Sequence, residues 1–130
     1  MASMAIAELR GYQQICGGNG AIMVIGIDIG GTNLRAAVVS EAGEVLAHRS
    51  CPTVRNAEAL ISDLDRLVRE LRQPATAAIG LGIPGRVDVQ NGQVYPGGYV
   101  DLSCFGVVRH FEDGFGLPAF ADNDGNMALL

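Results

Sequence analysis

A short polar and glycine-rich run separates two apolar segments near the start of the chain. The run reads Asp28-Ile-Gly-Gly-Thr-Asn33. Its glycines would let backbone N–H groups approach an anion, and Thr32 would add a hydroxyl donor. Asp28 could hold a hydrated magnesium ion. We therefore predict a phosphate-binding loop made by Asp28, Gly30, Gly31 and Thr32, with Mg²⁺ held by Asp28 through water.

Two features of this loop remain open at the level of sequence. A tight turn at Gly31 is expected to need a positive φ angle, which glycine adopts without steric cost. The alternative to a phosphate loop is an ordinary hairpin turn in which Asp28 accepts backbone hydrogen bonds. A hairpin accounts for the glycines but has no use for an acid at the end of its first strand.

A second polar cluster, Asp122-Asn-Asp-Gly-Asn126, follows a short apolar segment near the end of the chain. We expect Asp122 to end a strand and Asp124 to belong to the turn after it. The two carboxylates are therefore not interpreted as a paired acid and base. The alternative is an Asx-rich turn that caps a following helix.

Composition limits the classes of function. The 130 residues are 48% hydrophobic, which suits one compact domain. A net charge of −5 argues against a nucleic-acid surface, and the absence of lysine excludes a P-loop nucleotide site. Three scattered cysteines favour a reduced, cytoplasmic setting, and no segment is long and apolar enough to enter a membrane. Neither His48 nor His110 has a partner at metal-ligand spacing.

The elements that would position these residues follow from periodicity. The apolar segments Ile22–Ile29, Leu34–Ser40 and Val45–Cys51 predict an antiparallel meander. Apolar residues at helical spacing then predict an amphipathic helix that is capped by Asn56 and ends before Pro74.

The second half of the sequence predicts an alternation of strand and helix. Thr76–Ile83 is almost wholly apolar, as in a strand covered on both faces, and Val87–Tyr95 predicts a small hairpin that turns at Asn91-Gly92. A helix over Phe105–Phe115 and a short strand over Ala119–Ala121 follow, and residues 127–130 begin another helix. Residues 1–21 form an N-terminal extension ahead of this fold.

This order of elements resembles the first half of the actin-like ATPase (ribonuclease H-like) fold, and three motifs narrow the resemblance to the ROK family (repressors, open reading frames, kinases). The first motif is Asp28–Asn33, the second is Gly80-Leu-Gly-Ile-Pro-Gly-Arg-Val-Asp88, and the third is Asp122–Asn126. The first motif resembles the family's first phosphate loop, which implies that Asn33 also binds phosphate. The resemblance implies an α/β lobe over residues 22–130, with a mixed five-stranded sheet, an antiparallel opening meander and flanking helices. It also implies that a C-terminal lobe is absent from this chain.

The resemblance assigns roles to individual residues. In such kinases the acid of the Asn-Asp pair takes the proton from the sugar hydroxyl, a role that falls on Asp124, and Asn123 binds sugar hydroxyls. Gly85 and Arg86 resemble substrate contacts of acetylated-hexosamine kinases, although Arg86 is equally well interpreted as a surface arginine. Gly98 lies in a further substrate loop, where glucokinase-like members often have Asn and this chain has Pro96-Gly-Gly-Tyr99.

The function implied is transfer of the terminal phosphoryl group of ATP, with Mg²⁺, to the hydroxyl of a sugar or an acetylated amino sugar. The full-length parent would be a homodimer, and any structural Zn²⁺ would lie in the missing lobe. Two alternatives remain open: the sugar-sensing lobe of a ROK-type transcriptional repressor, and a truncated, non-catalytic sugar-binding product. A helix-turn-helix does not fit in about 20 residues before the first strand, which disfavours the repressor.

Overall fold

The computed structural model describes residues 22–85, 87, 88, 90–96 and 100–123. Their centre is a five-stranded sheet with the strand order β3-β2-β1-β4-β7. The predicted extension over residues 1–21 and the predicted helix start at residues 127–130 lie outside the described residues.

The first three strands form the predicted antiparallel meander. They are β1 (Met23–Ile29), β2 (Asn33–Ser40) and β3 (Val45–Pro52), each within one residue of its predicted bounds. Gly43 adopts a φ of 89° in the turn between β2 and β3, a conformation that favours glycine. The β3 strand forms one edge of the sheet.

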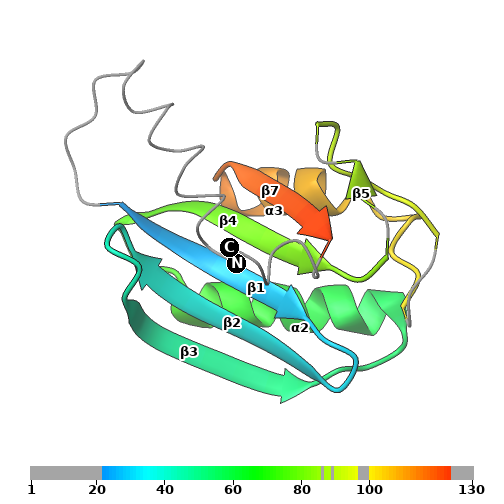
Figure 1. Cartoon of the computed structure of the whole chain (residues 1–130), viewed down its shortest axis with the longest axis horizontal. Helices are drawn as coiled ribbons and strands as arrows, with labels where there is room; N and C mark the ends of the chain where they lie inside the picture. The colour runs from blue at the N-terminus through cyan, green and yellow to red at the C-terminus, as the bar shows by residue number, and fades with distance from the viewer. Residues whose placement is uncertain (1–21, 86, 89, 97–99, 124–130) are drawn as a thin grey trace.

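Two more strands extend the sheet on the other side of β1, and both run parallel to it. They are β4 (Thr76–Ile83) and β7 (Ala119–Asn123). The predicted small hairpin is confirmed as β5 (Val87–Asp88) and β6 (Gln93–Val94), with Gly92 at a φ of 68° in its turn. Figure 1 shows the arrowheads of β1, β4 and β7 pointing to the same edge, with β5 beside the end of β7.

Both described helices cover the same face of the sheet, behind the strands in Figure 1. The first, α2 (Ala57–Leu71), begins where the Asn56 side chain accepts a hydrogen bond from the Ala59 amide at 2.9 Å, as predicted. The second, α3 (Val107–Phe115), starts two residues later than expected and ends at Gly116 in the left-handed conformation. His110 on α3 lies 2.8 Å from Asp65 on α2, which links the two helices.

Strand alternation explains which side chains the helices bury. Every second residue of β1 points to the helices, and Ile25, Ile27 and Ile29 are all fully buried there. They meet the apolar stripe of α2, whose buried members are Leu60, Ile61, Leu64, Leu67, Val68 and Leu71. The opposite face carries a smaller apolar cluster: Ile22, Val24, Val39 and Ala78. One face of the sheet therefore holds the main core, and the other is available for polar groups at the strand ends.

Candidate phosphate and sugar site

At the carboxyl ends of the parallel strands β1, β4 and β7, residues of the predicted motifs lie side by side across the sheet. Asp28 of β1 pairs in register with Gly82 of β4, and Gly82 pairs with Asp122 of β7. Residues in register lie on the same face of a sheet, so both carboxylates lie on the face opposite the helices. With adjacent strands about 4.8 Å apart, their Cα atoms lie about 10 Å from each other. Gly82 contributes no side chain between them.

The β7 strand runs further than predicted, and this changes the assignment of its last residues. It ends at Asn123 rather than Ala121, so Asp122 lies within the strand and does not end it. The reason is register: Asp122 and Asn123 continue the ladder opposite Gly82 and Ile83 of β4. The Asp122 carboxylate also accepts a hydrogen bond from the Asn123 amide at 2.7 Å.

Asn123 and Gly85, which come from separate motifs, are brought into contact. The Asn123 side-chain amide donates a hydrogen bond to the Gly85 carbonyl. Gly85 has a φ of 92°, which turns the chain sharply after β4 and favours glycine. The contact joins the end of β7 to the loop after β4, so these two predicted sugar-binding residues lie side by side.

The predicted phosphate loop forms a compact turn. The Gly30 amide donates to the Asn33 carbonyl at 3.0 Å. A Cβ placed on Gly30 would lie 2.8 Å from the same carbonyl oxygen, so only glycine fits here without moving the backbone. The expectation of positive φ at Gly31 is wrong: among the described glycines, positive φ occurs at Gly43, Gly85, Gly92 and Gly116. The requirement for glycine in this turn is a close backbone approach, located one residue earlier.

A cavity of about 240 Å³ opens against this loop. It is lined by the five predicted phosphate-loop residues together with Arg35: Asp28, Gly30, Gly31, Thr32, Asn33 and Arg35. Asp28 is half-buried, whereas Gly31 and Thr32 are exposed. Residues with a carboxylate and a hydroxyl, together with two glycines that have no side chain, therefore line one small cavity, a set suited to phosphate and to a hydrated cation.

Thr53, which no sequence motif marks, forms two hydrogen bonds to the loop. Its hydroxyl donates to the Gly30 carbonyl at 2.6 Å, and its amide donates to the Thr32 carbonyl at 2.9 Å. These bonds connect the end of β3 to the turn between β1 and β2. No local motif marks Thr53, because its partners lie more than twenty residues away in sequence.

The remaining predicted site residues lie outside the described residues. They are Arg86, Gly98 and Asp124. Gly85 and Asn123 directly precede Arg86 and Asp124 in the sequence, and Val100 is the first described residue after Gly98. After the Gly98 loop, Asp101 accepts hydrogen bonds from the Ser103 hydroxyl at 2.6 Å and the Ser103 amide at 3.0 Å. These bonds lower the pKa of the Asp101 carboxyl below its usual value, with the hydroxyl as the larger cause.

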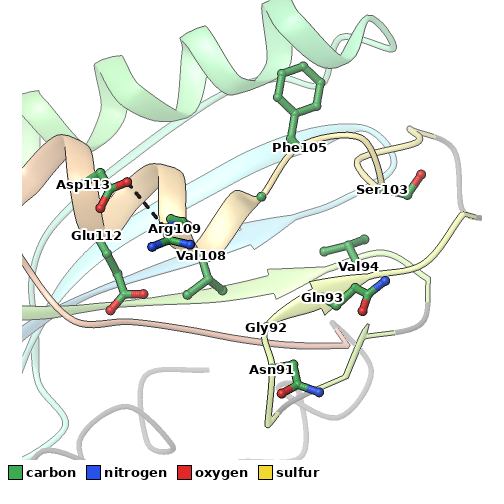
Figure 2. Close-up of a pocket in the computed structure, with 11 residues that line it drawn as sticks. Asn91, Gly92, Gln93, Val94, Ser103, Phe105, Val108, Arg109, Glu112 and Asp113 are labelled. Carbon is green, nitrogen blue, oxygen red and sulfur yellow. Dashed lines mark ion pairs between the residues drawn. The ribbon is translucent and has the colours of Figure 1, made fainter.

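A larger cavity of about 510 Å³ lies elsewhere, between the β5–β6 hairpin and α3. Figure 2 shows Val108 of α3 directed toward Gly92 of the hairpin, and a Cβ on Gly92 would approach a Val108 methyl to 2.8 Å. None of its described lining residues is a predicted site residue. Its ion pair, Arg109–Asp113 at 3.9 Å, is highly exposed and contributes little energy. The predicted site residues that the structure describes therefore lie outside this larger cavity.

The described residues contain neither a membrane-spanning helix nor a metal-binding cluster. No described helix is long and apolar enough to cross a membrane. Among the same residues, no group of three or more histidine, cysteine, aspartate or glutamate side chains is arranged to hold a metal ion.

Comparison with known proteins places this geometry in a family. The chain is 34% identical over 107 residues to a glucokinase of Streptomyces coelicolor, and 32% identical over 109 residues to an N-acetylmannosamine kinase of Yersinia pseudotuberculosis. These matches cover 82% and 80% of the chain but 34% and 36% of the relatives, so the chain spans about one third of their length.

A solved structure is also similar to this chain. A ROK family glucokinase from Streptomyces griseus, in complex with glucose and AMPPNP, matches 82% of the chain and 35% of its own length at 30% identity, with a TM-score of 0.75. This likeness confirms the predicted α/β class and the actin-like ATPase fold with a mixed five-stranded sheet. The family model of the ROK family matches residues 24–130, and the chain therefore belongs to the ROK family.

Proposed function

We propose that the protein containing this chain is an ATP-dependent sugar kinase, in which residues 22–130 form the N-terminal lobe. The observation that carries the proposal is the common edge of β1, β4 and β7. There the phosphate-loop cavity, the Asp28–Gly82–Asp122 row and the Asn123–Gly85 contact lie at the ends of adjacent strands. Phosphoryl transfer depends chiefly on positioning and electrostatic stabilisation, which such an edge can provide.

The loop of residues 28–33 would bind the phosphates of ATP. The donors would be backbone N–H groups of the turn and the Thr32 hydroxyl. The hydrogen bonds of Thr53 to the Gly30 and Thr32 carbonyls stabilise the turn. Asp28 would hold Mg²⁺ through water, because Mg²⁺ prefers carboxylate oxygens and retains several of its waters. The fit is supported by the half-buried Asp28 carboxylate beside the loop cavity. When bound, the ion would neutralise charge on the phosphate chain.

The ends of β4 and β7 would bind the sugar. Asn123 and Gly85 already contact each other, and Arg86 follows Gly85 directly in the sequence. Arg86 and Gly98 would supply further sugar contacts. Asp124 follows Asn123 directly and would act as the general base. Its carboxylate would accept the proton of the sugar hydroxyl while the hydroxyl oxygen forms a bond to the terminal phosphorus and the bond to ADP breaks.

The choice of sugar follows the relatives, whose names indicate glucose and N-acetylmannosamine as substrates. The proposal includes a cytoplasmic homodimer that does not bind nucleic acid, supported on the last point by the net charge of −5. Any structural Zn²⁺ would be bound outside residues 22–130.

The direct test is an ATP-consumption assay of the complete protein with glucose, a β-glucoside and N-acetylmannosamine. We expect one of these sugars to accelerate ATP consumption strongly and to yield a sugar phosphate. The 130-residue chain alone serves as a control and should turn over little, because about one third of the kinase cannot surround the transferring group. A complete protein that binds neither ATP nor sugar would refute the proposal.

A further inference from the structure

The face of the sheet opposite the helices carries a row of apolar side chains that crosses four strands. The members of this apolar row are cross-strand partners: Val45 of β3, Val39 of β2, Val24 of β1 and Ala78 of β4. Both described helices lie behind the sheet in Figure 1, on its other face. Neither of them can therefore cover the apolar row.

The exposure of the apolar row changes steeply from one strand to the next. Val24 and Ala78 are 0% exposed and Val39 is 9% exposed, whereas Val45 is 60% exposed. A side chain on an uncovered sheet face reaches solvent, as Val45 does, so β1 and β4 are covered here and β3 is not. A helix is about 10 Å wide with its side chains, and strands lie about 4.8 Å apart, so one helix covers about two strands. The exposure pattern therefore fits a single helix that lies over β1 and β4.

The neighbouring residues of β1 and β4 leave room for a close approach. Two residues further along the strands, Gly26 of β1 pairs with Gly80 of β4, and neither has a side chain. Phe120 of β7 follows Gly80 in register and packs against the apolar cluster that contains Val24 and Ala78. Glycines in the interior of a strand often mark the close approach of another backbone. The same two strands thus combine complete burial with space for a packed segment.

Residues 1–21 are joined directly to this surface. They precede Ile22, which is 1% exposed and belongs to the same apolar cluster, whereas residues 124–130 follow the opposite, polar end of the strands. The family match begins at residue 24, after this segment. A link rich in glycine, Gly17-Gly-Asn-Gly20, permits a sharp turn back onto the sheet. The residues before the link include apolar ones spaced by four, three and four, as on one face of a helix: Ala5, Leu9, Tyr12 and Cys16.

We propose that residues 5–16 form an amphipathic helix whose apolar face docks on Val24 and Ala78 and covers β1 and β4 on the side opposite α2 and α3. A helix of about 12 residues is only marginally stable in water, so docking stabilises the helix while it removes the apolar row from solvent. The assignment is independent of the proposed kinase function.

The experiment uses the 130-residue chain with two readouts. Methyl NOEs are recorded between the side chain of Leu9 and those of Val24 and Ala78. The reaction rate of Cys16 with a maleimide is measured by mass spectrometry, with the exposed Cys104 as the internal reference. The parent should show the Leu9 NOEs and should react more slowly at Cys16 than at Cys104.

Two matched variants locate the docking face, once circular dichroism has shown that the sheet is intact in both. Ala5→Asp places a charge on the proposed apolar face, and Ala7→Asp makes the same change on the opposite side of the helix. Ala5→Asp should raise the reactivity of Cys16 roughly tenfold and remove the Leu9 NOEs, because an unpaired charge is costly to bury, and Ala7→Asp should change neither.

Three results would overturn the proposal. The first is an equal response of Cys16 to Ala5→Asp and Ala7→Asp. The second is a set of NOEs that join Val24 and Ala78 to residues 124–130 in place of Leu9. The third is the appearance of these NOEs only between differently labelled chains in a mixed sample, which would identify a second copy as the cover.

Discussion

The two faces of the sheet differ most where β1, β4 and β7 end. On the helix side, consecutive rows are filled by apolar residues such as Ile27 opposite Leu81, both fully buried. On the other side, the next row holds Asp28, Gly82 and Asp122. A shift of one residue along each strand thus separates a close-packed core from a row of carboxylates.

The comparison shows how a strand can serve stability and chemistry at once. Because side chains alternate with a period of two, the residues that anchor β1 to the helices are the direct neighbours of those that face the site. Burial of Ile27 and Ile29 holds Asp28 between them in a fixed position. The core face thereby supplies the rigidity that a binding site requires.

The largest expected effect is a loss of catalytic turnover on substitution of Asp124, the proposed general base. In the complete protein, Asp124→Asn should lower kcat by about 10²–10⁴-fold while sugar affinity changes little, because an amide keeps the shape of the side chain but cannot take the proton. Steady-state kinetics with the preferred sugar measures this. The matched control, Asp113→Asn on the exposed surface of α3, should leave kcat unchanged. An Asp124→Asn enzyme that retains most of its turnover would shift the assignment to Asp122.

The next prediction compares substitutions at two adjacent residues of β1 that point to opposite faces of the sheet. Ile27→Ala should lower the free energy of unfolding by about 2–5 kcal/mol, because it removes a fully buried side chain. Asp28→Asn should cost about 1 kcal/mol or less and should instead abolish the Mg²⁺ dependence of ATP binding. Urea denaturation and ATP titration with and without Mg²⁺ measure the two quantities. Equal loss of stability, with Mg²⁺ dependence intact in Asp28→Asn, would show that Asp28 is structural.

A smaller effect is expected when a side chain is added at Gly30, which lies close to the Asn33 carbonyl. Gly30→Ala should lower stability by about 1–3 kcal/mol, because the added Cβ would lie 2.8 Å from the Asn33 carbonyl oxygen, and phosphate binding should weaken with it. Gly114→Ala on α3 is the matched control: its Cβ meets nothing within 4 Å, and alanine favours a helix. Denaturation and tripolyphosphate titration of both variants give the answer. A Gly30→Ala chain as stable as the parent would mean that the loop is not held in this turn.

The smallest effect concerns the support of the loop. Thr53→Val keeps the shape of the side chain but removes the hydroxyl that donates to Gly30 at 2.6 Å. The expected loss of stability is about 1 kcal/mol, with weaker phosphate binding because the turn is held less firmly. Thermal melting and phosphate titration measure both. Thr53→Ser, which retains the donor, should bind phosphate as the parent does, and a deficit in Thr53→Ser equal to that of Thr53→Val would exclude the hydrogen bond as the cause.

Sequence predicted the elements well because their signals are local. The apolar run of β4 and the Asn56 cap of α2 each matched the structure directly. The errors came from long-range pairing: β7 gained Asp122 and Asn123 because β4 offers them partners, and the glycine requirement moved to Gly30 through its contact with Asn33. Arg35 and Thr53 joined the site only once strand register had placed them beside the loop.

Nucleotide phosphates are expected to bind beside the loop of residues 28–33, at the common edge of β1, β4 and β7, rather than in the larger cavity beside α3. Titration of the isotope-labelled 130-residue chain with Mg·ATP, followed by backbone amide NMR, tests it most directly and detects weak binding. We expect saturable shifts at Gly30, Gly31, Thr32 and Asn33, with none above background at Gly92, Gln93 and Val94. Shifts at those hairpin residues, with an unperturbed loop, would contradict it.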